Sequence, residues 1–220
     1  MTMIQYIYGP MGAEKSGALV DIAERQISSL SFIAFTDASD SVNGAAIRSR
    51  KGNRSFPARP VIDSFDLLLQ VEGAIKGGVF MPGGFVLVDE VHRICRQSNH
   101  AEARAFIAAC MALAHRGFMV SVAGLDTGHH GHLLEPFDTI MHDPRLRRSV
   151  QLVRGAGGFC HFCGPECPST HSWMVEDREH PIAGRLGFEY LGVCSACFWE
   201  LMRQRVEARR ISTEEVRLAG

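Results

Sequence analysis

Residues 9 to 16, GPMGAEKS, place glycines, a lysine and a serine at the spacing of a phosphate-binding loop. Gly9, Lys15 and Ser16 are in register with G-x-x-x-x-G-K-S/T, and Gly12 adds a second position without a side chain. In such a loop, backbone N–H groups surround phosphates, the lysine neutralises their charge and the hydroxyl ligates magnesium. We therefore predict a phosphate site here, although an ordinary strand-to-helix turn could carry the same residues.

Glu14 stands where this motif has its second glycine. A carboxylate about 5 Å from a phosphate would weaken binding by on the order of 3 kcal/mol per unit charge. If the side chain turned to solvent instead, its charge would be screened and the backbone cradle would survive. The sequence therefore predicts reduced phosphate affinity, with loss of function as the alternative.

An acid pair, Asp89 and Glu90, follows the apolar run GFVLV. An aspartate in this position can hold hydrated magnesium, and its neighbour can accept a proton from an attacking hydroxyl. Acids at strand ends also serve as helix caps, which is the structural alternative. Together with Lys15 and Ser16, the pair points to phosphoryl transfer.

The C-terminal third of the chain carries a metal-binding pattern. Four of its cysteines form two C-x2-C pairs: Cys160 with Cys163, and Cys194 with Cys197. Two such pairs fill the four corners of a tetrahedral zinc site, which would then be structural and unable to activate water. The alternative is four buried free thiols. Other candidate ligands, which the double pair makes spares, are Cys167, His161 and His171.

A second histidine-rich segment, GLDTGHHGHLLEPF, contains His129, His130 and His132. Neutral imidazoles in such a loop could contact a ligand or hold a second metal ion. Histidine-rich surface loops without any ligand are the ordinary alternative.

Apolar runs alternate with helical patterns, which predicts an α/β fold with an open, doubly wound, mostly parallel sheet. The predicted strands are 3–9, 30–37, 84–90 and 118–126. The predicted helices are 15–28, a segment from Asp63 or Ser64 to Gly77 or Gly78, 98–115, and 195 to about 210. Residues 38–56 read as a polar loop. In such a sheet ligands bind at the carboxyl ends of the strands, where GPMGAEKS, TDASD, VDE and GLDTGHH all fall.

The composition of the chain changes near residue 155, where segments with periodic apolar residues give way to a region rich in cysteine, glycine and proline. We therefore expect two domains, an α/β nucleotide-binding domain over 1–154 and a zinc-binding domain with a C-terminal helix over 155–220.

Composition bounds the classes of partner. The chain has 220 residues, of which 46% are hydrophobic, and a formal net charge of -1. A mixed charge pattern of this kind does not predict nucleic-acid or membrane-surface binding. The N-terminal residues lack the pattern of a signal peptide, and no apolar run is long enough to span a bilayer. We expect a cytoplasmic protein, with reduced thiols.

These residues together resemble the zinc-containing, type II thymidine kinases of bacteria, animals and some large viruses. GPMGAEKSG is similar to the phosphate loop of that family, IRSRKG to the segment before its second helix, and VDEVHRI to its magnesium and general-base site. VSVAGLDTG with EPF is similar to its nucleoside-pocket strand and loop, and CHFCG with YLGVCSAC to its zinc-anchored lasso. Five motifs in the order of the family cover most of the chain.

The resemblance implies a P-loop sheet with a small C-terminal zinc lasso, and a homotetramer. It implies transfer of the γ-phosphoryl group of ATP to the 5'-hydroxyl of a deoxynucleoside bound under the lasso, with Mg²⁺ and structural Zn²⁺ as cofactors. Glu90 would be the general base. The ATP and magnesium ligands would be Gly9, Gly12, Lys15, Ser16 and Asp89. The nucleoside contacts would be His130, Phe137 and Tyr190.

The departures from the family lie at the ligand site. Glu14 replaces a glycine, Gly128, His129 and His130 stand where the family has an aromatic and then a basic residue, and PIAGRLGFEYLGV only partly matches the lasso. The leading hypothesis is a deoxynucleoside kinase. The alternative is a catalytically impaired nucleotide-binding or assembly protein on the same scaffold.

Overall fold

A six-stranded sheet forms the centre of the computed structural model, which describes residues 4–26, 32–39, 45–49, 52–95, 99–175 and 190–218. The strand order is β5-β2-β6-β7-β1-β8, and every neighbouring pair in it is parallel. The strands are β1 (Ile4–Tyr8), β2 (Phe32–Asp37), β5 (Arg59–Val61), β6 (Phe85–Val88), β7 (Met119–Gly124) and β8 (Val150–Arg154). The predicted α/β class with a parallel sheet is confirmed.

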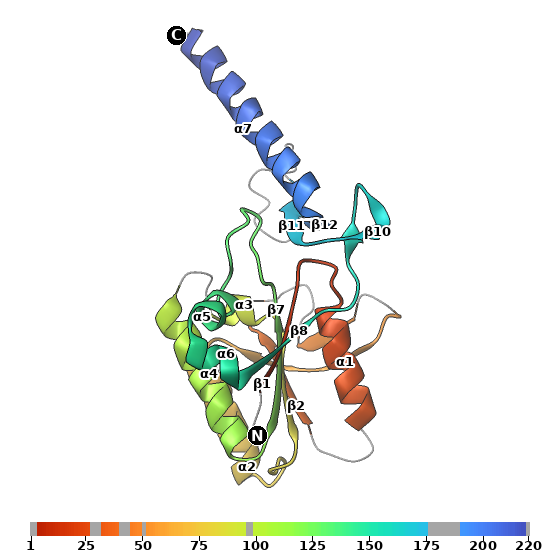
Figure 1. The fold of residues 1–220 in the computed structure, drawn as a ribbon. Helices are drawn as coiled ribbons and strands as arrows, with labels where there is room; N and C mark the ends of the chain where they lie inside the picture. Colours follow the sequence, from red (N-terminus) through yellow and green to blue (C-terminus); the bar gives the residue numbers. More distant parts are fainter. Residues whose placement is uncertain are drawn as a thin grey trace.

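Helices cover both faces of this sheet (Figure 1). One face carries α1 (Lys15–Gln26) and a small hairpin of β3 (Ala46–Arg48) and β4 (Ser55–Pro57). The other face carries α2 (Ser64–Lys76), α3 (Val91–Ile94), α4 (His100–His115) and α5 (Phe137–His142). A short helix, α6 (Pro144–Ser149), leads into β8.

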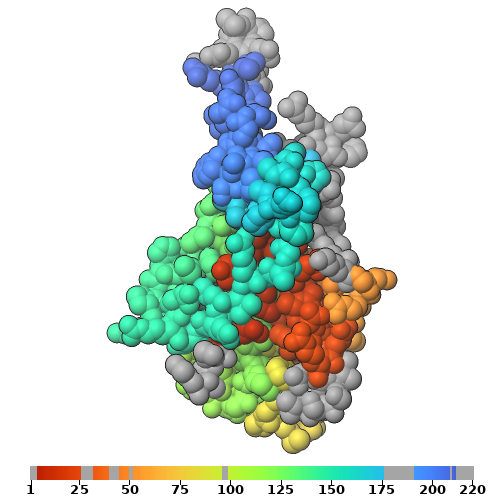
Figure 2. Space-filling model, turned by 45° about the vertical axis from the view of Figure 1, so that its right-hand side comes forward, coloured from red at the N-terminus to blue at the C-terminus, as the bar shows by residue number. Residues whose placement is uncertain are grey.

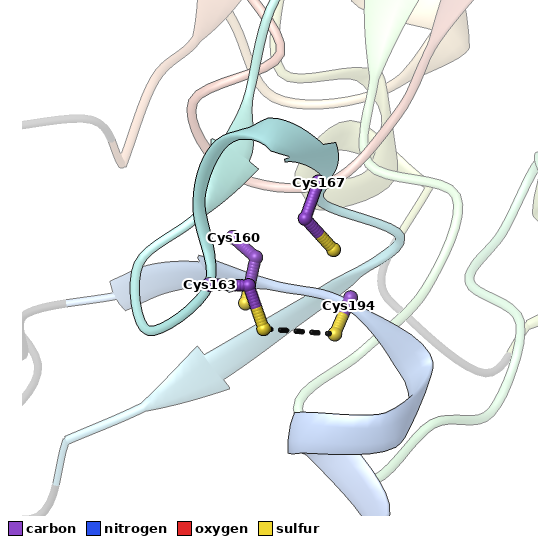
Figure 3. A group of neighbouring side chains, drawn as sticks. All are labelled: Cys160, Cys163, Cys167 and Cys194. Carbon is purple, nitrogen blue, oxygen red and sulfur yellow. Dashed lines mark hydrogen bonds between the residues drawn. The ribbon is translucent and has the colours of Figure 1, made fainter.

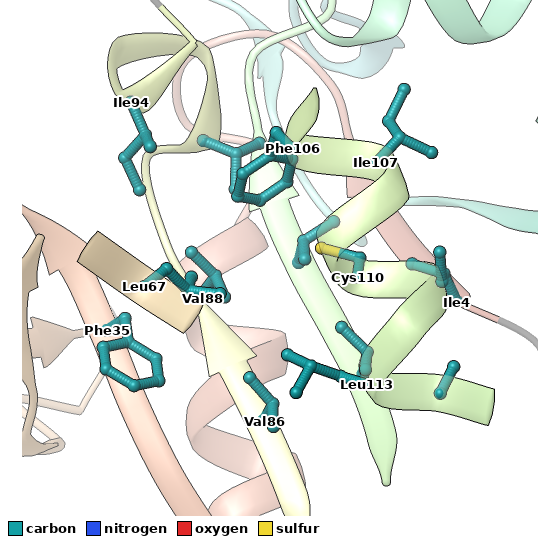
Figure 4. Packing of buried hydrophobic residues seen from close by; sticks show 14 of the residues in the cluster. Ile4, Phe35, Leu67, Val86, Val88, Ile94, Phe106, Ile107, Cys110 and Leu113 are labelled. Carbon is teal, nitrogen blue, oxygen red and sulfur yellow. The ribbon is translucent and has the colours of Figure 1, made fainter. Parts of the chain in front are cut away.

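The side chains of each strand alternate between two hydrophobic cores. On β6, Val86 and Val88 face the larger core with Leu67 of α2 and Leu113 of α4, whereas Leu87 faces α1 (Figure 4). Because both faces are covered, the strands read as nearly continuous apolar runs. This is why the sequence pattern predicted the central strands.

The C-terminal part forms a separate lobe above the carboxyl ends of the strands (Figure 1). It consists of two antiparallel hairpins followed by a long helix. These elements are β9 (Phe159–Cys160) with β10 (Gly164–Pro168), β11 (His171–Met174) with β12 (Tyr190–Val193), and α7 (Ser195–Leu218). Helix α7 points away from the body and ends later than the predicted residue 210.

Two predictions about strands and loops were wrong, and a third concerns residues that the structure does not describe. The predicted polar loop over 38–56 contains the β3–β4 hairpin, and β5 and β8 form the two edges of the sheet where no strand was expected. Residues 181–189, most of the predicted lasso segment, lie outside the described residues. Within the described part of the chain, no helix has the length and apolarity needed to cross a membrane.

Candidate functional site

The phosphate-loop sequence connects β1 to the first turn of α1, as the motif requires. Its glycines have left-handed or extended positive φ values, 146° at Gly9 and 80° at Gly12. Inside the turn, the N–H of Ala13 donates to the carbonyl of Pro10 at 3.2 Å. The ammonium of Lys15, which is only 9% exposed, donates to the same carbonyl at 2.8 Å. The loop is therefore folded around its lysine.

Glu14 adopts φ 54°, the left-handed region in which glycine is the favoured residue. The backbone thus keeps the shape that the missing glycine would give. Its side chain lies along the first turn of α1, because a Cβ placed on Gly17 would be 3.0 Å from the Glu14 carboxylate and 3.1 Å from the Ser49 hydroxyl. The side chain is half-buried, and its predicted effect on phosphate binding stays a prediction.

Asp89 lies at the end of β6 and faces the phosphate loop. It is 5% exposed, and its backbone N–H donates to the carbonyl of Phe35 on β2 at 2.9 Å. Burial raises the pKa of Asp89 to about 7, and the charge of Glu90 adds to this effect. A hydrogen bond from the Ser16 hydroxyl and the charge of Lys15 act in the opposite direction. The structure thus brings Lys15, Ser16, Asp89 and Glu90 together.

Glu90 is held by an unexpected neighbour, His92. The Glu90 backbone is left-handed, with φ 56°, and its side chain is 27% exposed. The Nε2 atom of His92 lies 3.4 Å from Oε2 of Glu90. On the other side of the ring, the N–H of Leu125 donates to Nδ1 at 3.2 Å. Since Nδ1 accepts a hydrogen bond, the ring proton of a neutral His92 is on Nε2 and faces Glu90.

His92 is neutral at physiological pH. Burial, together with the charges of Lys15 and Arg93, lowers its pKa to about 3. Arg93 itself is bound to Asp37 at the end of β2, with Nε 3.2 Å from Oδ2. The carboxyl end of β7 adds Asp126, whose pKa is raised by burial and lowered by the charge of Lys15. The ends of β2, β6 and β7 therefore meet at one polar rim beside the phosphate loop.

Cysteines from both pairs meet in the C-terminal lobe, and Figure 3 shows Cys160, Cys163 and Cys194 together with Cys167. One set of thiols has all sulfur atoms within 4.8 Å of one another: Cys160, Cys163, Cys167 and Cys194. The Sγ of Cys197 lies 3.4 Å from the Sγ of Cys163. Burial raises the pKa of Cys160, but N–H groups of Cys194, Cys163 and Phe162 donate to its sulfur and leave the pKa lowered. This cluster of thiols could bind zinc, which prefers tetrahedral thiolate ligands.

Comparison with known proteins shows to which family the chain belongs. A family model described as thymidine kinase matches residues 2–198. The chain belongs to the thymidine kinase family. The thymidine kinase of Ureaplasma parvum serovar 3 (strain ATCC 700970) is 28% identical over 183 residues, which are 80% of this chain and 71% of that protein. The thymidine kinase of Rhodothermus sp. (strain ITI 518) is 32% identical over 89 residues, 40% of this chain and 38% of that protein.

In this thymidine kinase family member, the loop after β7 reaches toward the C-terminal lobe. Thr127 and Leu133 form an antiparallel bridge at its base, and Gly131 lies against Phe198 of α7. The ring of the exposed His130 lies 3.9 Å from that of His129. Two groups of residues among those described have ligand atoms close enough for a metal, and the loop histidines belong to neither.

The other two predicted nucleoside contacts lie at the start of α5 and of β12. Phe137 is 7% exposed and packs on Tyr8, with ring centroids 4.9 Å apart, and on Tyr6 at 6.0 Å. Tyr190 pairs with Met174 through the backbone of β12, and its side chain lies outside the described residues. The roles predicted for both residues in binding a nucleoside stay predictions.

Sequence reasoning gave no role to His92, Asp126 or Ser172. His92 and Asp126 belong to the motifs VDEVHRI and GLDTG. Because these motifs follow the carboxyl ends of β6 and β7, the sequence could have predicted that both residues lie at the site. Ser172 had no such signal, because its hydroxyl accepts a hydrogen bond from the N–H of Met11 across 161 residues of sequence, at 2.9 Å. Only the fold shows this contact between the C-terminal lobe and the phosphate loop.

Proposed function

We propose that this chain is a deoxynucleoside kinase that transfers the γ-phosphoryl group of ATP to the 5'-hydroxyl of thymidine or a related nucleoside. The observation that carries the proposal is the contact between the phosphate loop and the acid pair, in which Ser16 donates to Asp89. A helix N-terminus, a lysine and a carboxylate at one rim are the parts that phosphoryl transfer requires. Membership of the thymidine kinase family supports this reaction class.

The phosphates of ATP would lie in the loop. Gly9 and Gly12 leave its backbone N–H groups accessible, and Lys15 would exchange the carbonyl of Pro10 for phosphate oxygens. Ser16 and Asp89 would hold magnesium, which would neutralise phosphate charge during transfer. These hard oxygen ligands fit the ion, and a cation bound here would counteract the burial and the Glu90 charge that raise the pKa of Asp89.

Glu90 would act as the general base toward the 5'-hydroxyl. Its carboxylate is partly exposed at the rim, next to Asp89 and within 3.4 Å of the His92 ring. An N–H facing the carboxylate would fix its orientation while leaving the other oxygen for the substrate. The nucleoside would lie between this rim and the zinc lobe, with His130, Phe137 and Tyr190 as its proposed contacts.

Zinc would have a structural role in residues 155–220, because four thiolates leave no open position for water. The assembly that we propose is a homotetramer, in line with the resemblance drawn from the sequence motifs. Light scattering coupled to size-exclusion chromatography measures the number of chains directly.

The proposal is tested by incubating the purified protein with ATP, magnesium and thymidine, and detecting the nucleoside monophosphate by mass spectrometry. A panel of deoxynucleosides and modified pyrimidine nucleosides identifies which base the protein accepts. Lys15→Met should abolish product, and Lys76→Met, on the exposed side of α2, should leave it unchanged. Failure of the wild-type protein to phosphorylate any nucleoside would refute the kinase proposal.

Glu14 favours a second candidate, a nucleotide-sensing or assembly protein that has lost transfer. Its carboxylate lies in the first turn of α1, next to the proposed phosphate site. Calorimetry separates the two candidates, since thymidine binding without ATP binding fits only the second. Glu14→Gln should strengthen ATP binding by more than about a hundredfold if the charge opposes phosphate at this position, because it removes a cost on the order of 3 kcal/mol. An unchanged affinity would show that Glu14 does not oppose ATP.

A further inference from the structure

A second group of side chains that could hold a metal ion lies where α4 and α5 begin, far from the thiols in sequence. It consists of His100, Glu135 and Asp138, whose ligand atoms all lie within 4.8 Å of one another. His100 is the first residue of α4, and Asp138 belongs to the first turn of α5. Because α5 packs beside α4 (Figure 1), the fold brings together residues that are 35 or more positions apart in the sequence.

We propose that His100, Glu135 and Asp138 bind a divalent zinc-type cation, with water in the fourth position. The inference goes beyond the proposed kinase activity, because it needs neither ATP nor a nucleoside and uses none of the residues assigned to phosphoryl transfer. It also concerns an ion other than the one that the thiols would hold.

The carboxylate of Glu135 is the observation that points to a ligand. Glu135 is only 2% exposed. Its Oε2 accepts a hydrogen bond from the N–H of Thr139 at 3.1 Å, which satisfies one free donor of α5. Its Oε1 is buried as well, and no group in the described part of the chain donates a hydrogen bond to it. A buried carboxylate oxygen without a donor is costly, and a bound cation would offset that cost.

The ring of His100 lies against this oxygen. Its Nδ1 contacts Oε1 of Glu135, and the hydroxyl of Thr139, 3.2 Å from Nδ1, helps to hold the ring in place. A neutral ring with its proton on Nε2 presents a lone pair at Nδ1, which would repel the carboxylate unless a cation lay between them. The structural alternative is a protonated His100 that forms a simple ion pair with Glu135. Zinc binding distinguishes the two.

Asp138 brings the third ligand from the surface. Its side chain is 27% exposed, and one of its oxygens lies 2.8 Å from Nδ1 of His142. A histidine beside a ligating carboxylate fixes the orientation of that carboxylate. Arg104 adds positive charge nearby, but its guanidinium binds Asp143 at 3.2 Å. The site opens to solvent through a hollow, by which a hydrated ion can enter; its lining residues are His100, Arg104, Asp138, Thr139 and His142.

The ligand types indicate which cation fits. One imidazole and two carboxylates suit zinc, whereas magnesium and calcium prefer oxygen ligands alone. Zinc bonds of about 2.0–2.2 Å place neighbouring ligand atoms of a tetrahedral site roughly 3.4 Å apart. The exposed His100 and the partly exposed Asp138 can adjust to this spacing around the fixed Glu135. Three protein ligands leave one position for water.

Counting zinc ions per chain tests the proposal on the wild-type protein. The protein is first equilibrated with one equivalent of zinc, which the softer thiolates take. It is then titrated with further zinc in a calorimeter, and native mass spectrometry counts the bound ions. We expect one further zinc per chain. If the wild-type protein binds no zinc beyond the first equivalent, the proposal is wrong.

Cobalt shows which ligands hold the second ion. Added to the protein that already contains one zinc, it should bind without the thiolate-to-cobalt charge-transfer band, because the proposed ligands are nitrogen and oxygen atoms. A thiolate band that grows with the second equivalent would place the ion at the cysteines and would overturn the proposal.

Substitutions locate the second ion. Loss of a partner outside the ligand set costs about 10- to 100-fold in metal affinity, so loss of a ligand should cost more than about 100-fold. His100→Gln and Glu135→Gln should both show this loss for the second zinc and retain the first. Glu135→Gln keeps an acceptor for the N–H of Thr139, and circular dichroism confirms that each variant is folded.

His115→Gln is the matched control, because His115 is the exposed histidine at the other end of α4. It should bind the second zinc as tightly as the wild type. Wild-type affinity for the second zinc in His100→Gln and Glu135→Gln, or an equal loss in His115→Gln, would contradict the proposal.

Discussion

Burial of Asp89 opposes the charged form of its carboxyl group, which its proposed role as a magnesium ligand requires. Its carboxyl is 5% exposed next to the carboxylate of Glu90, and this raises its pKa to about 7 from 3.8. The hydrogen bond from Ser16 and the charge of Lys15 do not offset these effects. A site that binds magnesium and phosphate can hold such a carboxylate, because the cation restores the missing positive charge.

The stability of the metal-free protein should therefore depend on pH through Asp89. Because its folded-state pKa lies above the unfolded value, the folded state binds more protons between about pH 4 and pH 7, and its stability falls as pH rises through this window. Asp89→Asn removes the effect. Urea unfolding should show the variant gaining a few kcal/mol relative to wild type from about pH 4 to pH 8. Glu207→Gln, on the exposed side of α7, is the control, and a pH-independent difference for Asp89→Asn would contradict the account.

His92 is predicted to position Glu90 without exchanging protons. His92→Phe removes the N–H that faces the carboxylate and should lower kcat by about tenfold with little change in KM. It should also move the acidic limb of the pH–rate profile to higher pH, because a hydrogen bond to the charged carboxylate is lost. His92→Gln keeps an N–H donor and should restore much of the rate. Equal losses in both variants, with an unchanged pH profile, would show only a packing role.

At the scale of elements, helix α2 shows how a local signal fixes a boundary. Asp63 was one of two predicted caps, and its carboxylate accepts a hydrogen bond from the N–H of Asp66 at 2.8 Å. At the other end the helix stops before Gly77, and Gly78 follows at φ 68°. Such caps involve only neighbouring residues, so the sequence contains what is needed to predict them.

The cap gives a direct stability prediction. Asp63→Ala should lower the free energy of unfolding by about 1 kcal/mol, because the first turn of α2 loses an acceptor for an otherwise unpaired N–H. Asp63→Asn keeps an acceptor oxygen and should lie close to wild type. Urea denaturation at neutral pH measures both, and an equal loss in the two variants would indicate that the charge matters rather than the hydrogen bond.

The elements that sequence reasoning missed depend on distant partners. Strand β8 forms because it pairs with β1 at the edge of the sheet, with Ile4 opposite Val150. Its own alternation of apolar and polar residues is too weak to predict a strand. The β3–β4 hairpin gains its stability by placing Ile47 and Phe56 in the core against α1. The position of Cys167 in the thiol cluster likewise depends on the path of β10. The partners of β8 and of the β3–β4 hairpin in the sheet and the core, β1 and α1, are far from them in sequence.

At the scale of the whole molecule, the C-terminal lobe packs directly against the phosphate loop. In the space-filling view, the segment after β8 lies directly on the N-terminal region (Figure 2). A Cβ on Gly155 would be 2.1 Å from the carbonyl oxygen of Ala13, and one on Gly192 would be 2.9 Å from that of Met11. Together with the Ser172 hydroxyl on the Met11 N–H, these contacts support the loop from above.

This packing predicts that a small change in the lobe disturbs the phosphate loop. Gly155→Ala forces its new methyl group against the Ala13 backbone and should weaken ATP binding by about tenfold, with an overpacking cost of about 1–3 kcal/mol in stability. Gly73→Ala is the matched control, since nothing lies within 4 Å of its added Cβ. Calorimetry with ATP measures the effect. Unchanged ATP affinity in Gly155→Ala would show that the lobe does not support the loop.

The most direct test of the central claim is the rate of nucleoside monophosphate formation by Glu90→Gln beside wild type, with ATP binding measured on both proteins. We predict that wild type forms the product and that Glu90→Gln slows it by about 10²- to 10⁴-fold, while ATP affinity stays the same, because the variant loses the base and keeps the phosphate loop. A variant that turns over at the wild-type rate would contradict the account.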